Sequence, residues 1–176
     1  MNKVLSIVVT SMLAMGAASA YADETCTDSA VKAIEAAGEN LHSNQYEPTA
    51  TTAKSIIAIA DSCESSAVRV AAAKKLAKAL SSGTEPTSTV AVEMKRLCGS
   101  DAGCAVEAIE SLKNGIHSNQ TEPTITAAHA IVEIVKRAPT QTVKQKAIEA
   151  LSMGLGSGTS PGSEISEAIA EVGKCE

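Results

Sequence analysis

The octapeptide HSNQYEPT, residues 42–49, returns almost letter for letter as HSNQTEPT, residues 117–124. The similarity continues at the same offset of 75 residues, since AVKAI from Ala30 aligns with AVEAI from Ala105. Each 75-residue unit divides into two weaker copies, because four of the five prolines are spaced 38, 37 and 38 residues apart: Pro48, Pro86, Pro123 and Pro161. Self-similarity at this period indicates a repeat architecture.

The apolar spacing predicts what one copy looks like. Before the octapeptide, Val31, Ile34 and Leu41 recur at helical steps, and the residues after each proline do the same. Proline is tolerated in the first turn of a helix, and a polar Ser-Asn segment is typical of a turn. Each copy is therefore predicted to be a helix, a short polar loop and a second helix. The predicted fold class is all-α, with four tandem α-helical hairpins, eight helices and a repeat of about 37–38 residues.

At the level of architecture, residues 23–175 resemble α-solenoid hairpin repeats of the HEAT or tetratricopeptide kind, without the aromatic signature of the latter. The resemblance implies a short α-solenoid. The alternative is that each 75-residue unit closes as a four-helix bundle. The glycines of GSDAG, residues 99–103, place the boundary between two repeat units of two hairpins each, 23–98 and 99–176.

The N-terminus predicts export. Met-Asn-Lys precedes an apolar stretch, and Ala20-Tyr21-Ala22 forms a cleavage pattern before Asp23, so residues 1–22 are expected to be a signal peptide. The apolar stretch is shorter than the roughly 20 residues that span a bilayer. We expect a periplasmic or secreted protein without membrane insertion. Without residues 1–22 the net charge is −6 and Tyr46 is the only aromatic residue, which argues against nucleic acid as a partner.

Five cysteines lie near the predicted hairpin junctions. In an α-hairpin the start of the first helix meets the end of the second, so Cys26 is expected to pair with Cys63. Cys98 and Cys104 flank the GSDAG turn and are expected to form a second disulfide. The main rival pairing is Cys63 with Cys98. Cys175 is then an unpaired thiol, which favours an intermolecular disulfide.

The repeated octapeptide has two interpretations. We expect a turn that was duplicated with its scaffold. The alternative is weak zinc or copper binding by His42 with Glu47 and by His117 with Glu122, since imidazole and carboxylate are ligands of these metals. His129 aligns with Lys54 and is expected on a helix surface.

No nucleophile–base pair or phosphate-binding loop is present in the sequence, so we expect no enzyme and no cofactor. The favoured function is a protein- or peptide-binding module in the periplasm or outside the cell. The alternative is a self-assembling structural protein. Its own copies would be joined through Cys175, or through basic residues on one helix (Arg69, Lys74, Lys75 and Lys78) and acidic ones on the last (Glu164, Glu167 and Glu171).

Overall fold

The prediction of an all-α fold is confirmed in the computed structural model, which describes residues 24–41, 46–80, 85–116, 121–155 and 161–175. These residues form eight α-helices and no strand. The first helix spans residues 24–38. The others are α2 (Tyr46–Ser62), α3 (Ser66–Leu76), α4 (Glu85–Leu97), α5 (Ala102–Leu112), α6 (Thr121–Arg137), α7 (Gln141–Ser152) and α8 (Gly162–Lys174). Short 3-10 turns extend α3, α5 and α7.

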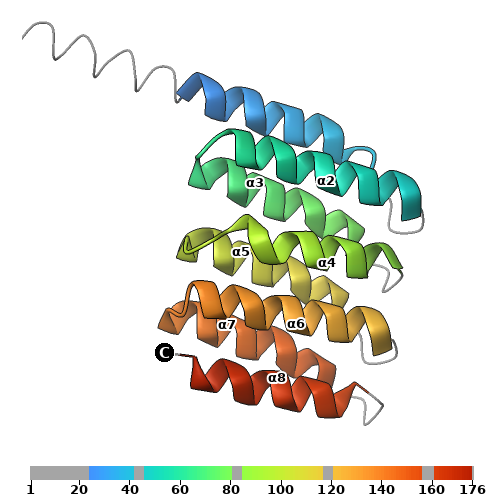
Figure 1. Cartoon of the computed structure of the whole chain (residues 1–176), viewed down its shortest axis with the longest axis vertical. Helices are drawn as coiled ribbons and strands as arrows, with labels where there is room; N and C mark the ends of the chain where they lie inside the picture. Colours follow the sequence, from blue (N-terminus) through green and yellow to red (C-terminus); the bar gives the residue numbers. More distant parts are fainter. Residues whose placement is uncertain (1–23, 42–45, 81–84, 117–120, 156–160, 176) are drawn as a thin grey trace, which may run out of the picture.

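The helices stack in two layers (Figure 1). The front layer consists of α2, α4, α6 and α8, and each of these packs against the next helix of the same layer. The back layer contains α3, α5 and α7, which pack on one another in the same way. Helix 24–38 lies at one end of the stack and α8 at the other. No described helix is long and apolar enough to cross a membrane.

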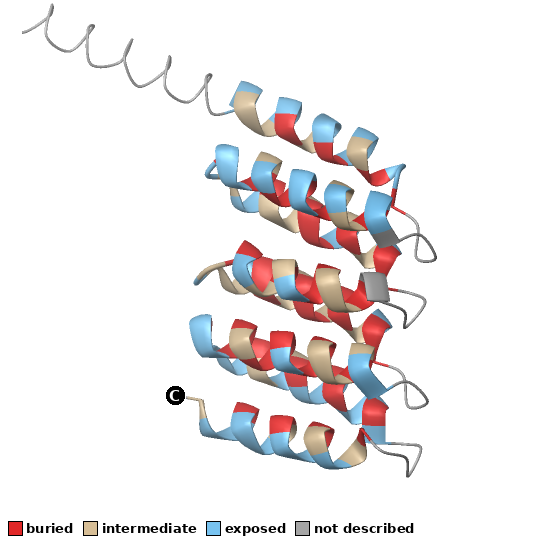
Figure 2. Cartoon of the chain, turned by 45° about the vertical axis from the view of Figure 1, so that its right-hand side comes forward, coloured by how far each residue is buried: buried red, intermediate tan, exposed pale blue. Residues whose placement is uncertain are grey.

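The core between the layers is aliphatic, as a chain almost without aromatic residues requires. Its largest fully buried side chains come from both layers and include Leu76, Ile109 and Leu151 at the back and Ile56, Met94 and Ile131 at the front. Figure 2 shows the buried residues on the helix faces that meet other helices and the exposed ones on the outward faces. Many of the remaining core positions are alanine, which lets neighbouring helices approach closely.

One such close approach lies where α7 ends. A Cβ atom on Gly154 would lie 3.0 Å from the Ile165 Cγ1 and 3.1 Å from the Ile116 Cγ2. Such distances are shorter than ordinary van der Waals contact, so the packing of α8 against this turn depends on the missing side chain.

Two helix starts of the back layer are capped by side chains. The Asp101 carboxylate accepts a hydrogen bond from the Cys104 amide at 3.0 Å, at the start of α5. The Thr140 hydroxyl accepts one from the Val143 amide at 3.3 Å, at the start of α7. These bonds satisfy amides that have no partner within the helix, and they end the preceding connection at a defined residue.

Candidate functional site

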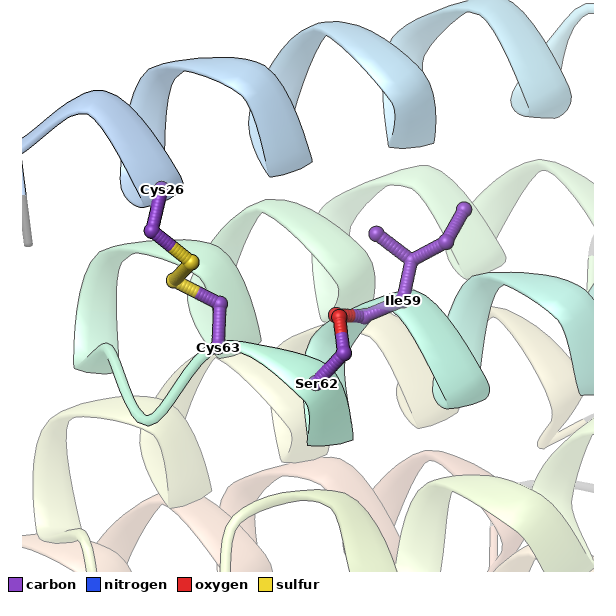
Figure 3. The surroundings of a disulfide bond; sticks show 4 residues. All are labelled: Cys26, Ile59, Ser62 and Cys63. Atoms are coloured by element: carbon purple, nitrogen blue, oxygen red, sulfur yellow. A yellow bond between two sulfur atoms is a disulfide. The ribbon is translucent and has the colours of Figure 1, made fainter.

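Four of the five cysteines form two disulfides. Cys26 of helix 24–38 forms a disulfide with Cys63 at the end of α2, with a Cα–Cα distance of 6.2 Å (Figure 3). Cys98 forms a second one with Cys104 at 5.2 Å, across the turn between α4 and α5. Both distances lie in the usual range for disulfides, about 4.4–6.8 Å. The rival pair of Cys63 with Cys98 is not formed.

Cys175 follows the last helix and is the free cysteine of the described residues. Its side chain is partly exposed, and its thiol donates a hydrogen bond to the Glu171 carbonyl oxygen at 3.5 Å. The thiol is therefore held against the end of α8 and remains in contact with solvent.

The histidines of the metal hypothesis, His42 and His117, lie outside the described residues. Their proposed partners Glu47 and Glu122 are exposed in the first turns of α2 and α6. A carboxylate near the N-terminus of a helix interacts favourably with the helix dipole. Within the described part of the chain, no group of three histidine, cysteine or acidic residues is arranged to hold a metal ion.

A hollow of about 520 Å³ lies beside the Cys26–Cys63 disulfide, at the N-terminal end of the stack. Ile59 and Ser62 of α2 form one wall of it (Figure 3). The Ser62 hydroxyl donates to the Ile59 carbonyl oxygen at 2.7 Å, so its proton is already used within the helix.

The more extensive depression is a groove across the outer face of the front layer. It begins between α2 and α4 as a hollow of about 400 Å³, lined by Lys54, Val92 and Glu93 among others. Val92 also lines the next hollow, of about 170 Å³ between α4 and α6, together with Lys95 and His129. Because neighbouring hollows share lining side chains, they adjoin one another across the front layer.

The third hollow extends to α8, the last helix. It has a volume of about 330 Å³ and is lined by Lys95 and His129 together with Glu133, Lys136 and Glu171. The row of three adjoining hollows, which we call the front groove, therefore involves α2, α4, α6 and α8.

Sequence reasoning missed the front groove. Lys54, Val92 and His129 occupy equivalent positions of three successive copies, 38 and 37 residues apart. The spacing was a usable signal, because equivalent positions of a repeat lie in a row. The three side chains differ in chemical type, however, so no recurring motif marks the row.

The acidic side chains of the front groove are already paired. Glu93 forms an ion pair with Arg96. Lys136 binds Glu133 at 2.9 Å and Glu171 at 2.8 Å, and so bridges α6 to α8. The hydrogen bond from Lys136 is the main cause that lowers the pKa of Glu133, and the bond to Glu171 is the main cause that raises the pKa of Lys136.

The charges of the back layer pair between successive helices. Lys78 and Lys75 both reach Glu39, at 3.2 and 3.3 Å, and the hydrogen bond from Lys78 is the main cause that lowers the pKa of Glu39. Further along, Lys146 binds Glu110 at 2.8 Å. Lys74 likewise meets Glu107, at 3.6 Å. Three of the four basic residues that we considered for binding another copy thus have acidic partners within the chain.

The chain matches no protein-family model, no curated protein and no solved structure. Functional inference therefore depends on the geometry and the charges of the two outer faces.

Proposed function

We propose that the chain is an exported, non-enzymatic α-solenoid of four hairpins that binds a protein or peptide segment in its front groove. The observation that carries the proposal is the row of adjoining hollows, whose lining residues come from all four helices of the front layer. The two disulfides of the chain fit an oxidising compartment, which agrees with export and removal of residues 1–22.

The packing across the middle of the chain supports a solenoid over two closed bundles. The contacts of α3 with α5 and of α4 with α6 both cross the junction between the 75-residue units. Each also matches a contact within a unit, such as that of α2 with α4. Closed four-helix bundles would pack their helices around two separate cores, whereas a solenoid repeats one interface throughout.

The form of the front groove favours an extended segment. Axes of packed helices lie about 8–10 Å apart, so three steps from α2 to α8 cover about 24–30 Å. An extended chain rises about 3.3 Å per residue, and about seven to nine residues would fill this length. The hydroxyl groups of Ser88 and Thr89 line the front groove and offer donors and acceptors to a peptide backbone. The Thr126 hydroxyl donates to the Glu122 carbonyl oxygen at 3.0 Å and can still accept.

The same groove is poorly equipped for catalysis. Its carboxylates are held by Arg96 and Lys136, and the lowered pKa of Glu133 makes this group a weaker base. General bases work best with a pKa near the operating pH, and enzymes raise the pKa of a carboxylate for this purpose.

The test is peptide phage display on the oxidised protein beginning at Asp23. We expect selected peptides to lose affinity with Val92→Asp, which places a charge in the middle of the groove. Ile148→Asp is the matched control, because Val92 and Ile148 are 43% and 39% exposed and Ile148 belongs to the back layer. Failure to select any peptide, or equal losses with both variants, would overturn the proposal.

Self-assembly is the second candidate, and the partly exposed thiol of Cys175 favours it. Light scattering after size exclusion, with and without reductant, tests it: a dimer that dissociates on reduction supports the candidate, and a monomer in both conditions removes it. Stacking of copies end to end has less support. Helix 24–38 and α8 each contain three acidic residues and one lysine, so the two ends repel one another.

A further inference from the structure

The front groove contains charges of both signs, but they are not equally available to a ligand. Its three carboxylates, from Glu93, Glu133 and Glu171, all have basic partners within the chain. By contrast, Lys54 and Lys95 form no ion pair with any described residue. A segment entering the groove therefore meets two unpaired ammonium groups and no unpaired carboxylate.

The order of side chains along the groove adds a second feature. Lys54 lines the first hollow and Lys95 the second and third. Val92 lines both the first and the second, so it lies between the two lysines, and 43% of its surface is exposed. The first half of the groove thus presents a positive side chain, an apolar one and a second positive one, in the order Lys54, Val92 and Lys95.

We propose that the partner is an extended acidic segment in which carboxylates on either side of an aliphatic residue contact Lys54 and Lys95, while that residue covers Val92. Alternate side chains of an extended chain point to the same side, so the matching pattern is Glu-x-Val-x-Glu. This inference specifies the ligand of the proposed binding module and rests on that function.

The net charge of −6 that remains without residues 1–22 does not prevent binding of an acidic segment. At physiological ionic strength the screening length is about 8 Å, so a carboxylate in the groove interacts mainly with nearby charges. The Glu133 carboxylate could compete with a ligand for Lys95, since the two charges interact. Lys136, however, already forms an ion pair with this carboxylate. The Lys95 ammonium group is left for a ligand.

The experiment uses three fluorescein-labelled peptides and the oxidised protein beginning at Asp23. The first probe is Glu-Gly-Val-Gly-Glu-Gly-Val-Gly-Glu, whose length of about nine residues matches the groove. The other two replace every Glu by Gln or by Lys. In fluorescence anisotropy we expect the Glu peptide to bind about four- to 25-fold more tightly than the Gln peptide, which cannot form the two ion pairs, and the Lys peptide to bind most weakly.

Two double variants with the same change of charge identify the site. We expect the double variant Lys54→Gln with Lys95→Gln to lower the affinity for the Glu peptide by about four- to 25-fold, which corresponds to about two- to fivefold per exposed ion pair. Lys32→Gln with Lys144→Gln is the control, because these lysines lie on helix 24–38 and α7 and form no ion pair with a described residue. We expect it to leave the affinity within twofold of the parent.

The inference is overturned if the Gln or Lys peptide binds as tightly as the Glu peptide, if both double variants lose the same affinity, or if none of the three peptides binds. These failures differ from failure of the proposed function. If Val92→Asp abolishes binding of a displayed peptide that is neutral or basic, the groove is a peptide site with a different specificity.

Discussion

A buried threonine gives the sharpest test of the packing. Thr49, Thr87 and Thr124 each follow a proline, occupy equivalent positions in three copies, and are fully buried. Thr49 and Thr124 have interaction partners, whereas the Thr87 hydroxyl has no hydrogen-bond partner among the described residues. A buried polar group without a partner costs about 1–3 kcal/mol. Thr87→Val keeps the branched shape and replaces the hydroxyl by a methyl group, so we expect the free energy of unfolding to rise by about 1–2 kcal/mol.

Urea unfolding of the oxidised protein, followed by circular dichroism, measures this difference. In a chain of this size a gain of about 1 kcal/mol also raises the melting temperature by about 2–4 °C. Thr49→Val and Thr124→Val are the matched controls, and we expect each to lower the free energy of unfolding by about 1 kcal/mol, because they remove a hydroxyl that has a partner. The reasoning is refuted if Thr87→Val is neutral or destabilising, or if all three variants change stability alike.

Three further predictions concern the scaffold. Gly154→Ala should lower the free energy of unfolding by about 1–3 kcal/mol in urea, because the new Cβ would lie 3.0 Å from Ile165; an unchanged value would mean that α8 can shift. Asp101→Ala should cost about 1 kcal/mol at pH 7. The hydrogen bond from the Ser66 side chain is the main cause that lowers the pKa of Asp101 from its usual value, so its ionised form stabilises the fold. This stability is lost as the pH falls through the folded-state pKa, so parent and variant should have the same free energy of unfolding at acid pH. A difference in free energy that stays constant with pH would contradict the assignment. Replacing Cys26 and Cys63 by serine opens a cross-link between residues 37 apart and should cost about 4 kcal/mol by calorimetry, whereas a loss below about 1 kcal/mol would exclude this pairing.

The helices could be predicted because their causes are local. Apolar steps of three and four and a proline in the first turn recur in the copies, so the eight helices follow from short stretches of sequence. The pairing of Cys26 with Cys63 required one further step of reasoning, namely that the start and the end of one hairpin lie close together. The pairing seen in the structure follows from hairpin geometry and requires no contact between distant repeats.

The front groove could not be predicted in the same way. It is formed where one hairpin packs on the next, and its lining side chains come from successive hairpins. The partners of its charges come from different helices, as with Lys136 of α6 and Glu171 of α8. A sequence shows that a glutamate is present, but only the packing shows whether that glutamate is paired or available.

The contrast between buried and groove positions indicates what kind of ligand fits. In the first turns of α2, α4 and α6, threonine occupies the same buried position in three copies: Thr49, Thr87 and Thr124. In the groove, the equivalent positions carry a cation at Lys54, an aliphatic side chain at Val92 and an imidazole at His129. A repeat with identical groove positions would fit a polymer of identical units. Successive groove positions of different chemistry instead fit one segment in one register. A shift of the bound segment by one helix would place a carboxylate against Val92.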